Sequence, residues 1–267
     1  MFDQSEFEIR FEWGAHGLGL LAPISDAVII VDIMSFSTAV TMATARGALV
    51  FPYRWKDESR VIFAQSMGAE LAGPRNAGGY SLSPLSLMAL QPGNRIVLPS
   101  PNGATLSLAT GTIPTFAGCL RNARAVAQAA QTIGPRIAVI ACGERWSSDE
   151  TLRPAFEDQL GAGAIISFLV GTLSPEAEAA AAIFANCRSD VLSRLRACAS
   201  GKELIERGFE ADIPVIAALN EDMVAPRLQN SAFFSTSASA GADPLLHGKA
   251  LEPPVEAIQP VPEKGKE

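Results

Sequence analysis

Short apolar runs alternate with polar loops along the chain, and three of these runs are each followed by a helical segment. They lie at Ala27–Ile33, Arg95–Leu98 and Arg136–Ala141. Such a run is typical of a strand buried on both faces of a parallel or mixed sheet. The pattern therefore predicts a three-layer α/β/α fold with a largely parallel or mixed central sheet.

The other expected elements follow from periodicity and from glycine and proline punctuation. In the first part of the chain we expect an edge strand at Phe7–Trp13, a Gly-rich loop, a helix at Thr38–Arg46 closed by Gly47, a strand at Leu49–Tyr53, a helix at Ser59–Met67, a long loop at Leu71–Pro92 and a short helix to Thr110. We then expect a strand at Pro114–Ala117, helices at Ala123–Thr132, from Pro154, at Glu176–Cys187, Ser189–Ala199 and Ser200–Gly208, a helix rather than a strand at Ile213–Leu219, and a strand at Met223–Leu228.

These elements predict one compact α/β domain over residues 1–240, or two intimately packed α/β halves at about 1–145 and 146–240. Beyond them the sequence is rich in Ala, Ser and Pro, and residues 241–267 are expected to form a loosely ordered tail.

The bulk composition narrows the class of protein. The chain has 267 residues, 48% of them hydrophobic, which suffices for a substantial core, and its net charge of -7 does not favour nucleic-acid binding. It has no apolar run long enough to span a membrane and no basic-then-apolar start. The four cysteines lack metal-site spacing and are predicted to be reduced thiols of a cytoplasmic protein. A homo-oligomer is left open.

Polar side chains collect just after the predicted strands. Ligands of such sheets bind beyond the carboxyl ends of the strands. The groups at these ends are Asp32, Ser35, Ser37, Thr38, Asn102, Thr105, Cys142 and Glu144. Carboxylates, hydroxyls and an amide suit a hard cation and an anionic substrate better than an apolar ligand.

Several segments, in order over roughly residues 25–230, resemble one family. Val31–Thr38 resembles the family motif Asp-Val-Leu-Arg-Ala-Thr-Thr-Thr, and Pro101–Ala104 resembles Thr-Asn-Gly-Thr. Arg121–Ala127 resembles Leu-Asn-Ala-x-Ala-Val-Ala, and Cys142-Gly143 with Phe156–Ala164 resembles Cys-Ala-Gly followed by Leu-Glu-Asp-x-Leu-x-Ala-Gly-Ala. Ser200–Leu204 and Gly208–Asp212 resemble the C-terminal part of the family. The chain thereby resembles the 2-phosphosulfolactate phosphatases, Mg²⁺-dependent α/β enzymes linked to coenzyme M synthesis.

The chain also departs from the family pattern. Ser35 stands where the family has arginine, and Pro74 stands for the glutamate of a Gly-Glu-Arg loop. The segment Gly79–Pro84 is shorter than its counterpart and carries Ser81 without the family's aspartate. A serine cannot give the bidentate phosphate contact of an arginine, so Arg75 and Arg121 are the candidates to supply the missing charge.

The resemblance implies hydrolysis of 2-phosphosulfolactate to sulfolactate and phosphate, with Mg²⁺ as cofactor. The implied metal ligands are Asp32, Glu157 and Asp158, and because adjacent helical residues point about 100° apart, one of the last two is expected to ligate and the other to brace it. The implied catalytic residues are Asp32, Asn102, Cys142 and Glu157. The implied substrate-binding residues are Ser35, Ser37, Thr38, Arg75, Asn102, Gly103, Arg121 and Asn122.

Each of these residues also has a structural interpretation. Asp32 and Ser35 are suitable helix caps, Asn102-Gly103 is a suitable tight turn, and Arg121 suits a surface position. Glu157 and Asp158 suit an acidic first helical turn, and Cys142 suits a small buried position. His16 and His247 lie at opposite ends of the chain, which does not favour a Ser-His-Asp hydrolase.

Two functional hypotheses remain. The first is a Mg²⁺-dependent phosphatase for a small phosphorylated hydroxy acid, whose partner is a small anionic metabolite rather than nucleic acid or membrane. The alternative is a non-catalytic relative that binds an anionic metabolite or a protein partner, which the changes at Ser35, Pro74 and Ser81 favour.

Overall fold

A computed structural model describes residues 3–55 and 57–235 of the chain. The tail predicted at residues 241–267 lies outside these residues, as does His247. Among the described helices, none combines the length and the apolarity needed to cross a bilayer.

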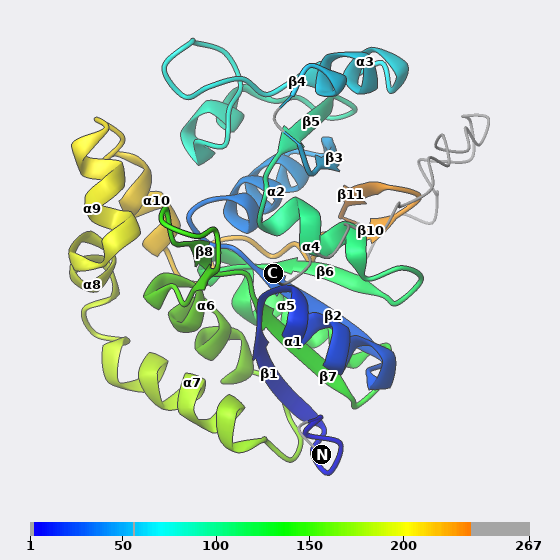
Figure 1. The fold of residues 1–267 in the computed structure, drawn as a ribbon, viewed down its shortest axis with the longest axis vertical. Coiled ribbons are helices and arrows are strands. Elements are labelled where there is room, and N and C mark those ends of the chain that lie inside the picture. The colour runs from blue at the N-terminus through cyan, green and yellow to red at the C-terminus, as the bar shows by residue number, and fades with distance from the viewer. Residues whose placement is uncertain (1–2, 56, 236–267) are drawn as a thin grey trace, which may run out of the picture. The chain divides into compact units, whose positions relative to one another are not determined.

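A nine-stranded mixed sheet forms the centre of the described residues (Figure 1). Its order is β1-β7-β2-β6-β10-β11-β3-β5-β4. The strands are β1 Ile9–Trp13, β2 Ala27–Val31, β3 Leu49–Tyr53, β4 Glu70–Leu71, β5 Arg95–Pro99, β6 Thr115–Gly118, β7 Ile137–Ala141, β10 Arg227–Gln229 and β11 Ala232–Phe234. Two sets are parallel, β1-β7-β2-β6 and β3-β5-β4. The predicted mixed sheet is confirmed.

A hairpin of β10 and β11 joins the two parallel sets. β10 pairs antiparallel with β6 and with β11, and β11 pairs antiparallel with β3. The turn residues Asn230 and Ser231 have φ values of 49° and 64°, in the left-handed region used by tight hairpins. Three successive antiparallel pairings reverse the strand direction, so the two parallel sets run in opposite senses.

Helices follow most strands. The α-helices are α1 Gly14–Leu21, α2 Phe36–Ala45, α3 Ser59–Ser66, α4 Gly103–Ala109, α5 Ala123–Gln131, α6 Phe156–Ile166, α7 Pro175–Cys187, α8 Val191–Ala197, α9 Ala199–Glu206 and α10 Asp212–Ala217. The 3₁₀ helices are η1 Ala22–Ile24, η2 Pro84–Ala89 and η3 Leu120–Asn122, and a small separate hairpin is formed by β8 Glu144–Arg145 and β9 Leu152–Arg153.

Alternate residues of β2 show why the fold has three layers. Ile29 and Val31 pack in a core with residues of α5, α6 and α7, whereas Val28 and Ile30 pack in another core with Leu18 of α1. All five residues of β2 are buried. Because successive strand residues point to opposite faces, a strand that is apolar throughout requires cover on both sides. The predicted α/β/α layering is confirmed.

The sequence-based elements were wrong in four places. The long loop expected at Leu71–Pro92 contains the 3₁₀ helix η2, and its first residue belongs to strand β4. The loop expected after Trp13 is helix α1, whose glycines hid it because glycine disfavours helix. The polar loop before Arg153 contains the β8–β9 hairpin. The strand expected at Met223–Leu228 begins only at Arg227, and its partner β11 was missed. Ile213–Leu219 forms helix α10 at Asp212–Ala217, so the preference for helix was correct.

The small residues of α6 allow close approach on two sides. A Cβ at Gly161 would lie 2.6 Å from Cγ2 of Ile33, next to the sheet. A Cβ at Gly163 would lie 2.0 Å from the carbonyl oxygen of Ala180 in α7. Helix packing at this distance therefore requires glycine, which explains two residues of low helix propensity inside α6.

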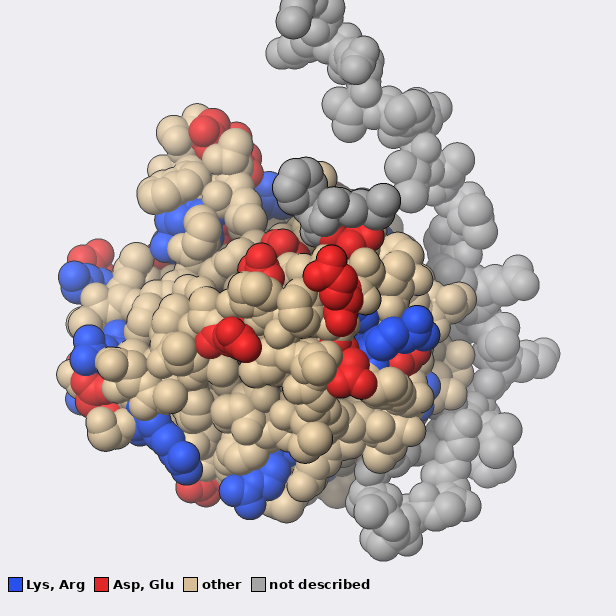
Figure 2. Space-filling model, turned by 90° about the horizontal axis from the view of Figure 1, so that it is seen from below, with Lys and Arg blue, Asp and Glu red and all other residues tan. Residues whose placement is uncertain are grey.

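Charged side chains are dispersed over the face drawn in Figure 2. Among the described residues there, basic and acidic side chains form small separate groups rather than a continuous basic stripe. This face therefore lacks the pattern that marks binding to a phosphate backbone.

Replacing Gly163 by alanine is expected to destabilise the protein by about 1–3 kcal/mol or more, because the added methyl group meets rigid backbone of α7. Gly19→Ala in α1 is the matched control, since a Cβ there meets no atom within 4 Å. It should be neutral or should stabilise by up to about 1 kcal/mol. Urea unfolding measures both changes, and equal effects for the two variants would contradict this account of α6.

Candidate active site

A cavity of about 370 Å³ lies beyond the carboxyl ends of β2 and β5. Its lining combines carboxylates, guanidinium groups, hydroxyls and an amide: Asp32, Met34, Ser35, Phe36, Arg75, Leu82, Ser100, Pro101, Asn102, Glu144, Ser200, Glu203, Leu204 and Arg207. Of the residues singled out in the sequence, five line this cavity, namely Asp32, Ser35, Arg75, Asn102 and Glu144.

Asp32 follows β2 and joins the two parallel sets of strands. Its Oδ1 accepts a hydrogen bond from the N–H of Phe36 at 3.2 Å, and its Oδ2 accepts one from the N–H of Gly103 at 2.9 Å. Burial raises the pKa of Asp32, and the charge of Glu157 adds to the increase, although the two N–H groups oppose it. The side chain is thus both a cap of α2 and a wall of the cavity, so its two sequence interpretations are compatible.

Asp158 braces the ends of two strands. Its Oδ1 accepts the N–H of Ile33 and its Oδ2 accepts the N–H of Gly143, each at 2.9 Å. Burial, followed by the charges of Asp32 and Glu157, raises its pKa well above the usual value. Because both oxygens bind backbone, Asp158 fixes the loops that follow β2 and β7 and does not line the cavity.

Glu157 has a different environment from its neighbour. It is buried in the first turn of α6, and its Oε2 has no hydrogen-bond partner among the described residues. Like Asp158, Glu157 does not itself line the cavity, and the thiol of Cys198 lies close enough that the Glu157 charge adds to burial in raising the pKa of that thiol. Its charge raises the pKa of Asp32 and contributes to raising that of Glu144. A buried carboxylate oxygen without a partner is costly, so this atom calls for a ligand that the protein itself does not supply.

Glu144 and Asn102 line the cavity and bind each other. Nδ2 of Asn102 donates to Oε2 of Glu144 at 3.0 Å. Burial raises the pKa of Glu144 to about 7, and the charge of Asp32 adds to the increase. A cavity-lining carboxyl group with this pKa can hold or release a proton near neutral pH.

The donor set fits a hard divalent cation. The charge of Glu157 contributes to raising the pKa of three neighbouring carboxyl groups, those of Asp32, Glu144 and Asp158, and one oxygen of Glu157 lacks a partner among the described residues. Among the described residues, no group of three or more His, Cys, Asp and Glu side chains is arranged to hold a metal ion. Mg²⁺ needs fewer protein ligands, because it keeps several waters and is bound through one or two carboxylates.

Arg75 reaches the cavity beside Ser35. Its Nη2 donates to Oγ of Ser35 at 2.6 Å, and its Nη1 pairs with the carboxylate of Asp212 in α10. Asp212 also accepts the hydroxyl of Ser83 at 2.5 Å. The guanidinium group therefore stands beside the serine that replaces the family's arginine, and Asp212 holds it there.

Three predicted substrate-binding residues instead bind backbone or the site's own carboxylate. Oγ of Ser37 donates to the carbonyl of Ile30 and accepts the N–H of Asp32. Oγ1 of Thr38 donates to the carbonyl of Ile33. The N–H of Gly103 donates to Asp32, as described above. These groups shape the loop around Asp32 and do not line the cavity.

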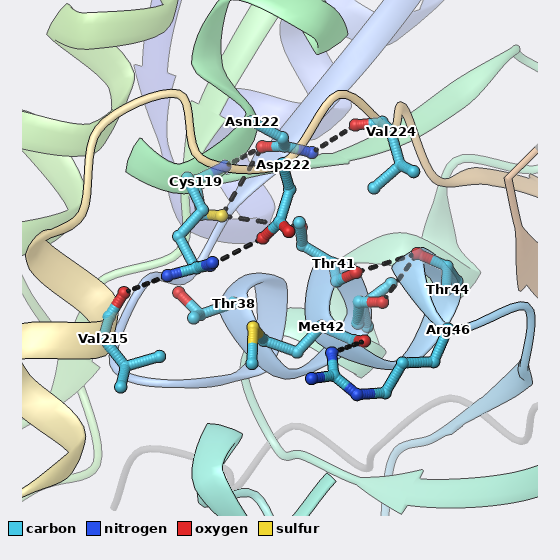
Figure 3. A network of polar contacts seen from close by, with 12 residues as sticks. Thr38, Thr41, Met42, Thr44, Arg46, Cys119, Asn122, Val215, Asp222 and Val224 are labelled. Atoms are coloured by element: carbon cyan, nitrogen blue, oxygen red, sulfur yellow. Dashed lines mark hydrogen bonds and ion pairs between the residues drawn. The ribbon is translucent and has the colours of Figure 1, made fainter. Parts of the chain in front are cut away.

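Arg121 and Asn122 lie outside the cavity lining. Figure 3 shows Asn122 in a network of polar contacts with Cys119 and Val224. Arg121 donates to Asp222 at 2.6 Å and to the carbonyl of Val215 at 2.9 Å. Asn122 is fully buried, and its Nδ2 donates to the carbonyl of Val224 at 3.2 Å. Both residues tie η3 to the C-terminal described segment, so the structure does not bring them to the other predicted site residues.

Cys142 is buried and does not line the cavity. Burial, together with the charges of Asp32, Asp158 and Glu144, raises the pKa of its thiol well above the ordinary value. A nucleophilic cysteine requires the opposite shift. All four cysteines of the chain are free thiols, as predicted.

Sequence reasoning did not assign Ser100, Ser200, Glu203, Arg207 or Asp212 to the site. Ser200, Glu203 and Asp212 lie in segments that carry the family resemblance, which was the available signal. Ser100 directly follows β5, and its Oγ donates to Asp32 at 3.5 Å. Arg207, which pairs with Glu203 at 2.6 Å, gave no sequence signal.

A cavity lined by carboxylates and arginines lies beyond the strand ends of an α/β sheet, which is where proteins of this class bind their ligands. The family model of 2-phosphosulpholactate phosphatase matches residues 20–231. The chain belongs to this family, which confirms the resemblance seen in the motifs.

Two relatives show how far the similarity extends. The chain is 31% identical over 206 residues to a probable 2-phosphosulfolactate phosphatase of Carboxydothermus hydrogenoformans, covering 73% of this chain and 82% of that protein. It is 29% identical over 191 residues to a 2-phosphosulfolactate phosphatase of Methanothermobacter thermautotrophicus, covering 71% and 80%.

Glu144→Gln is expected to raise the unfolding temperature more at pH 8 than at pH 4.5. The pKa of Glu144 is about 7 in the folded protein and about 4.5 ordinarily, so the folded state loses stability relative to the unfolded state as pH rises through this window. Glutamine cannot ionise, so the variant does not lose stability as the pH rises, and its side-chain oxygen can still accept the hydrogen bond from Asn102. Thermal unfolding in chelator tests this, with exposed Glu206→Gln as control; an equal gain at both pH values would contradict it.

Proposed function

We propose that the protein is a Mg²⁺-dependent phosphatase that hydrolyses a small phosphorylated hydroxy acid. The names of its relatives support the phosphatase activity, and the proposed cofactor rests on the carboxylates of the site. The observation that carries the proposal is that Asp32 and Arg75 line one cavity, while Glu157, whose charge acts on Asp32, keeps a buried oxygen without a partner among the described residues. This arrangement offers a cation and a phosphate group adjoining places. The reaction converts a phosphate monoester and water into an alcohol and phosphate, and 2-phosphosulfolactate is the first substrate to test.

Asp32 and Glu157 would hold the metal ion, and Asp158 would act through the loops it braces. When bound, Mg²⁺ polarises phosphoryl oxygens and lowers the pKa of its bound water. The assignment of Asp158 to bracing rests on its two hydrogen bonds to backbone N–H groups and on its absence from the cavity lining. Both oxygens of Asp32 also accept backbone N–H groups, but Asp32 lines the cavity. Glu157 is assigned as a metal ligand because its Oε2 is buried and has no hydrogen-bond partner among the described residues.

Arg75 would bind and orient the substrate phosphate. Its guanidinium group is positioned by Asp212 and by Ser35, so little conformational entropy is lost when an anion binds. Asn102 and Ser100 add hydrogen-bonding groups to the cavity lining. Glu144 would hold the proton that the departing alkoxide takes up, since its pKa of about 7 leaves it partly protonated at neutral pH.

Asp32→Asn is expected to lower turnover on the order of a hundredfold or more while the fold persists, because the variant loses the charge that faces the cavity. Phosphate release is measured on a panel of phosphorylated hydroxy acids, with Mg²⁺ and with chelator. Asp149→Asn, exposed in the β8–β9 hairpin, is the matched control.

A different result would be that the wild-type protein releases no phosphate from any compound of this panel while phosphorylated ligands still raise its unfolding temperature. That result would reject the phosphatase and support a non-catalytic anion-binding protein instead. Equal activity with Mg²⁺ and with chelator would reject the cofactor alone.

Cys142→Ala is expected to keep near wild-type turnover, because the buried thiol is held protonated and lies away from the cavity. Its cost should appear instead as a loss of about 1 kcal/mol in unfolding free energy, from the small void it leaves. Steady-state kinetics and urea unfolding separate the two effects. Abolished turnover in a folded variant would restore the cysteine to the catalytic set.

A further inference from the structure

A second, larger cavity adjoins the candidate active site. Its volume is about 540 Å³, and it shares Arg75, Leu82 and Arg207 with the first cavity. The remaining lining residues are Arg60, Ala72, Gly73, Pro74, Asn76, Pro99 and Phe209. The space lies within the range of about 300–1,000 Å³ that is typical of small-molecule sites.

The two cavities differ in charge. The first is lined by the carboxylates of Asp32, Glu144 and Glu203, whereas the described lining of the second contains no carboxylate. The second is lined by three arginines, at positions 60, 75 and 207. Positive charge in a cavity walled by low-dielectric side chains attracts an anion.

Arg60 is the arginine that lacks a partner. Arg75 is paired with Asp212, and Arg207 is paired with Glu203 at 2.6 Å. The Nε of Arg60 is buried and has no hydrogen-bond partner among the described residues. An unsatisfied guanidinium nitrogen at the wall of an acid-free cavity indicates that an anionic group completes this site.

Apart from Asn76, the rest of the described wall carries no polar side chain. Leu82, Pro99 and Phe209 contribute hydrocarbon surface, and the guanidinium of Arg75 lies over the ring of Phe209, 5.4 Å from its centroid. A ligand that reaches from Arg75 to Arg60 therefore passes along apolar side chains. This favours a carbon chain between two anionic groups rather than a compact three-carbon acid.

We propose that the second cavity binds a distal anionic group of the substrate, which makes the substrate a phosphorylated hydroxy acid with a carboxylate or sulfonate at the far end of a longer carbon chain. The inference rests on the proposed function, which places the phosphate in the first cavity. Arg60 is then a specificity-determining residue that contacts the distal group, and Arg75 stands between the two sites.

Two matched substrates test this assignment. 2-(Phosphonooxy)hexanedioate and 2-(phosphonooxy)hexanoate have the same chain length and the same phosphate ester next to a carboxylate, and they differ only by the distal carboxylate. The wild-type protein is expected to show a kcat/KM roughly tenfold or more higher for the hexanedioate, the size of one charged hydrogen bond. Arg60→Gln should abolish this preference through KM, with kcat unchanged, and Arg60→Lys should retain part of it.

The control variant is Arg188→Gln, an exposed arginine at the end of α7 that lines neither cavity, and it should keep the preference. Turnover without a preference, or a preference that Arg60→Gln leaves intact, would overturn the distal site while the phosphatase stands.

Calorimetric titration of 2-hydroxyhexanedioate, which needs no turnover, separates the two proposals. If no ester is hydrolysed but this dianion binds and Arg60→Gln weakens it about tenfold, the distal site stands and the phosphatase falls. Absence of both turnover and binding would reject both. Thermal unfolding of Arg60→Gln at the wild-type temperature confirms that each comparison is made on folded protein.

Discussion

The bond between the carboxylate of Asp32 and the N–H of Gly103 is the contact on which the site depends. Asp32 follows β2 and Gly103 opens α4 after β5, so one side chain links strands from the two oppositely directed parallel sets. A hydrogen bond to an ionised acceptor in a buried place is among the stronger ones in proteins. This close approach allows only glycine at position 103, since a Cβ there would lie 2.3 Å from Cδ1 of Phe36 and 2.8 Å from Oδ2 of Asp32. Catalytic geometry and sheet architecture thus share a single constraint.

Around this contact the protein separates charge. Acidic groups that disfavour one another's ionisation lie together at the strand ends, and arginines lie on the side of Phe209. Arg75 occupies the boundary, where Asp212 and Ser35 fix its direction. A ligand with anionic groups at both ends and a cation near one of them would match this gradient, whereas a neutral apolar ligand would meet unsatisfied charge at either end.

The sequence predicted the layers and most strands because apolar runs such as Ala27–Val31 can only be buried on both faces. It could not predict α1, where packing outweighs the poor helix propensity of three glycines, or the β10–β11 hairpin, whose strands are three residues long. For the site, position after a strand found Asp32 and Asn102, but it also selected Arg121 and Asn122, which hold the chain together elsewhere. Asp158 is bound by backbone N–H groups from distant loops whereas Glu157 keeps an oxygen without a partner in the part of the chain that the structure describes, and no local sequence pattern encodes this difference.

The position of the β10–β11 hairpin has a consequence for biosynthesis. Its strands, at residues 227–234, are the last of the sheet to leave the ribosome, yet they fill the middle of it between β6 and β3. Until then both neighbours present open edges, which are templates for wrong pairing. The sheet therefore cannot form completely until the last two strands have been translated. Pairing between strands that are far apart in the sequence is slow, and the unpaired edges can aggregate in the meantime. Shortening the chain from its C-terminal side into this hairpin would remove the centre of the molecule rather than its margin.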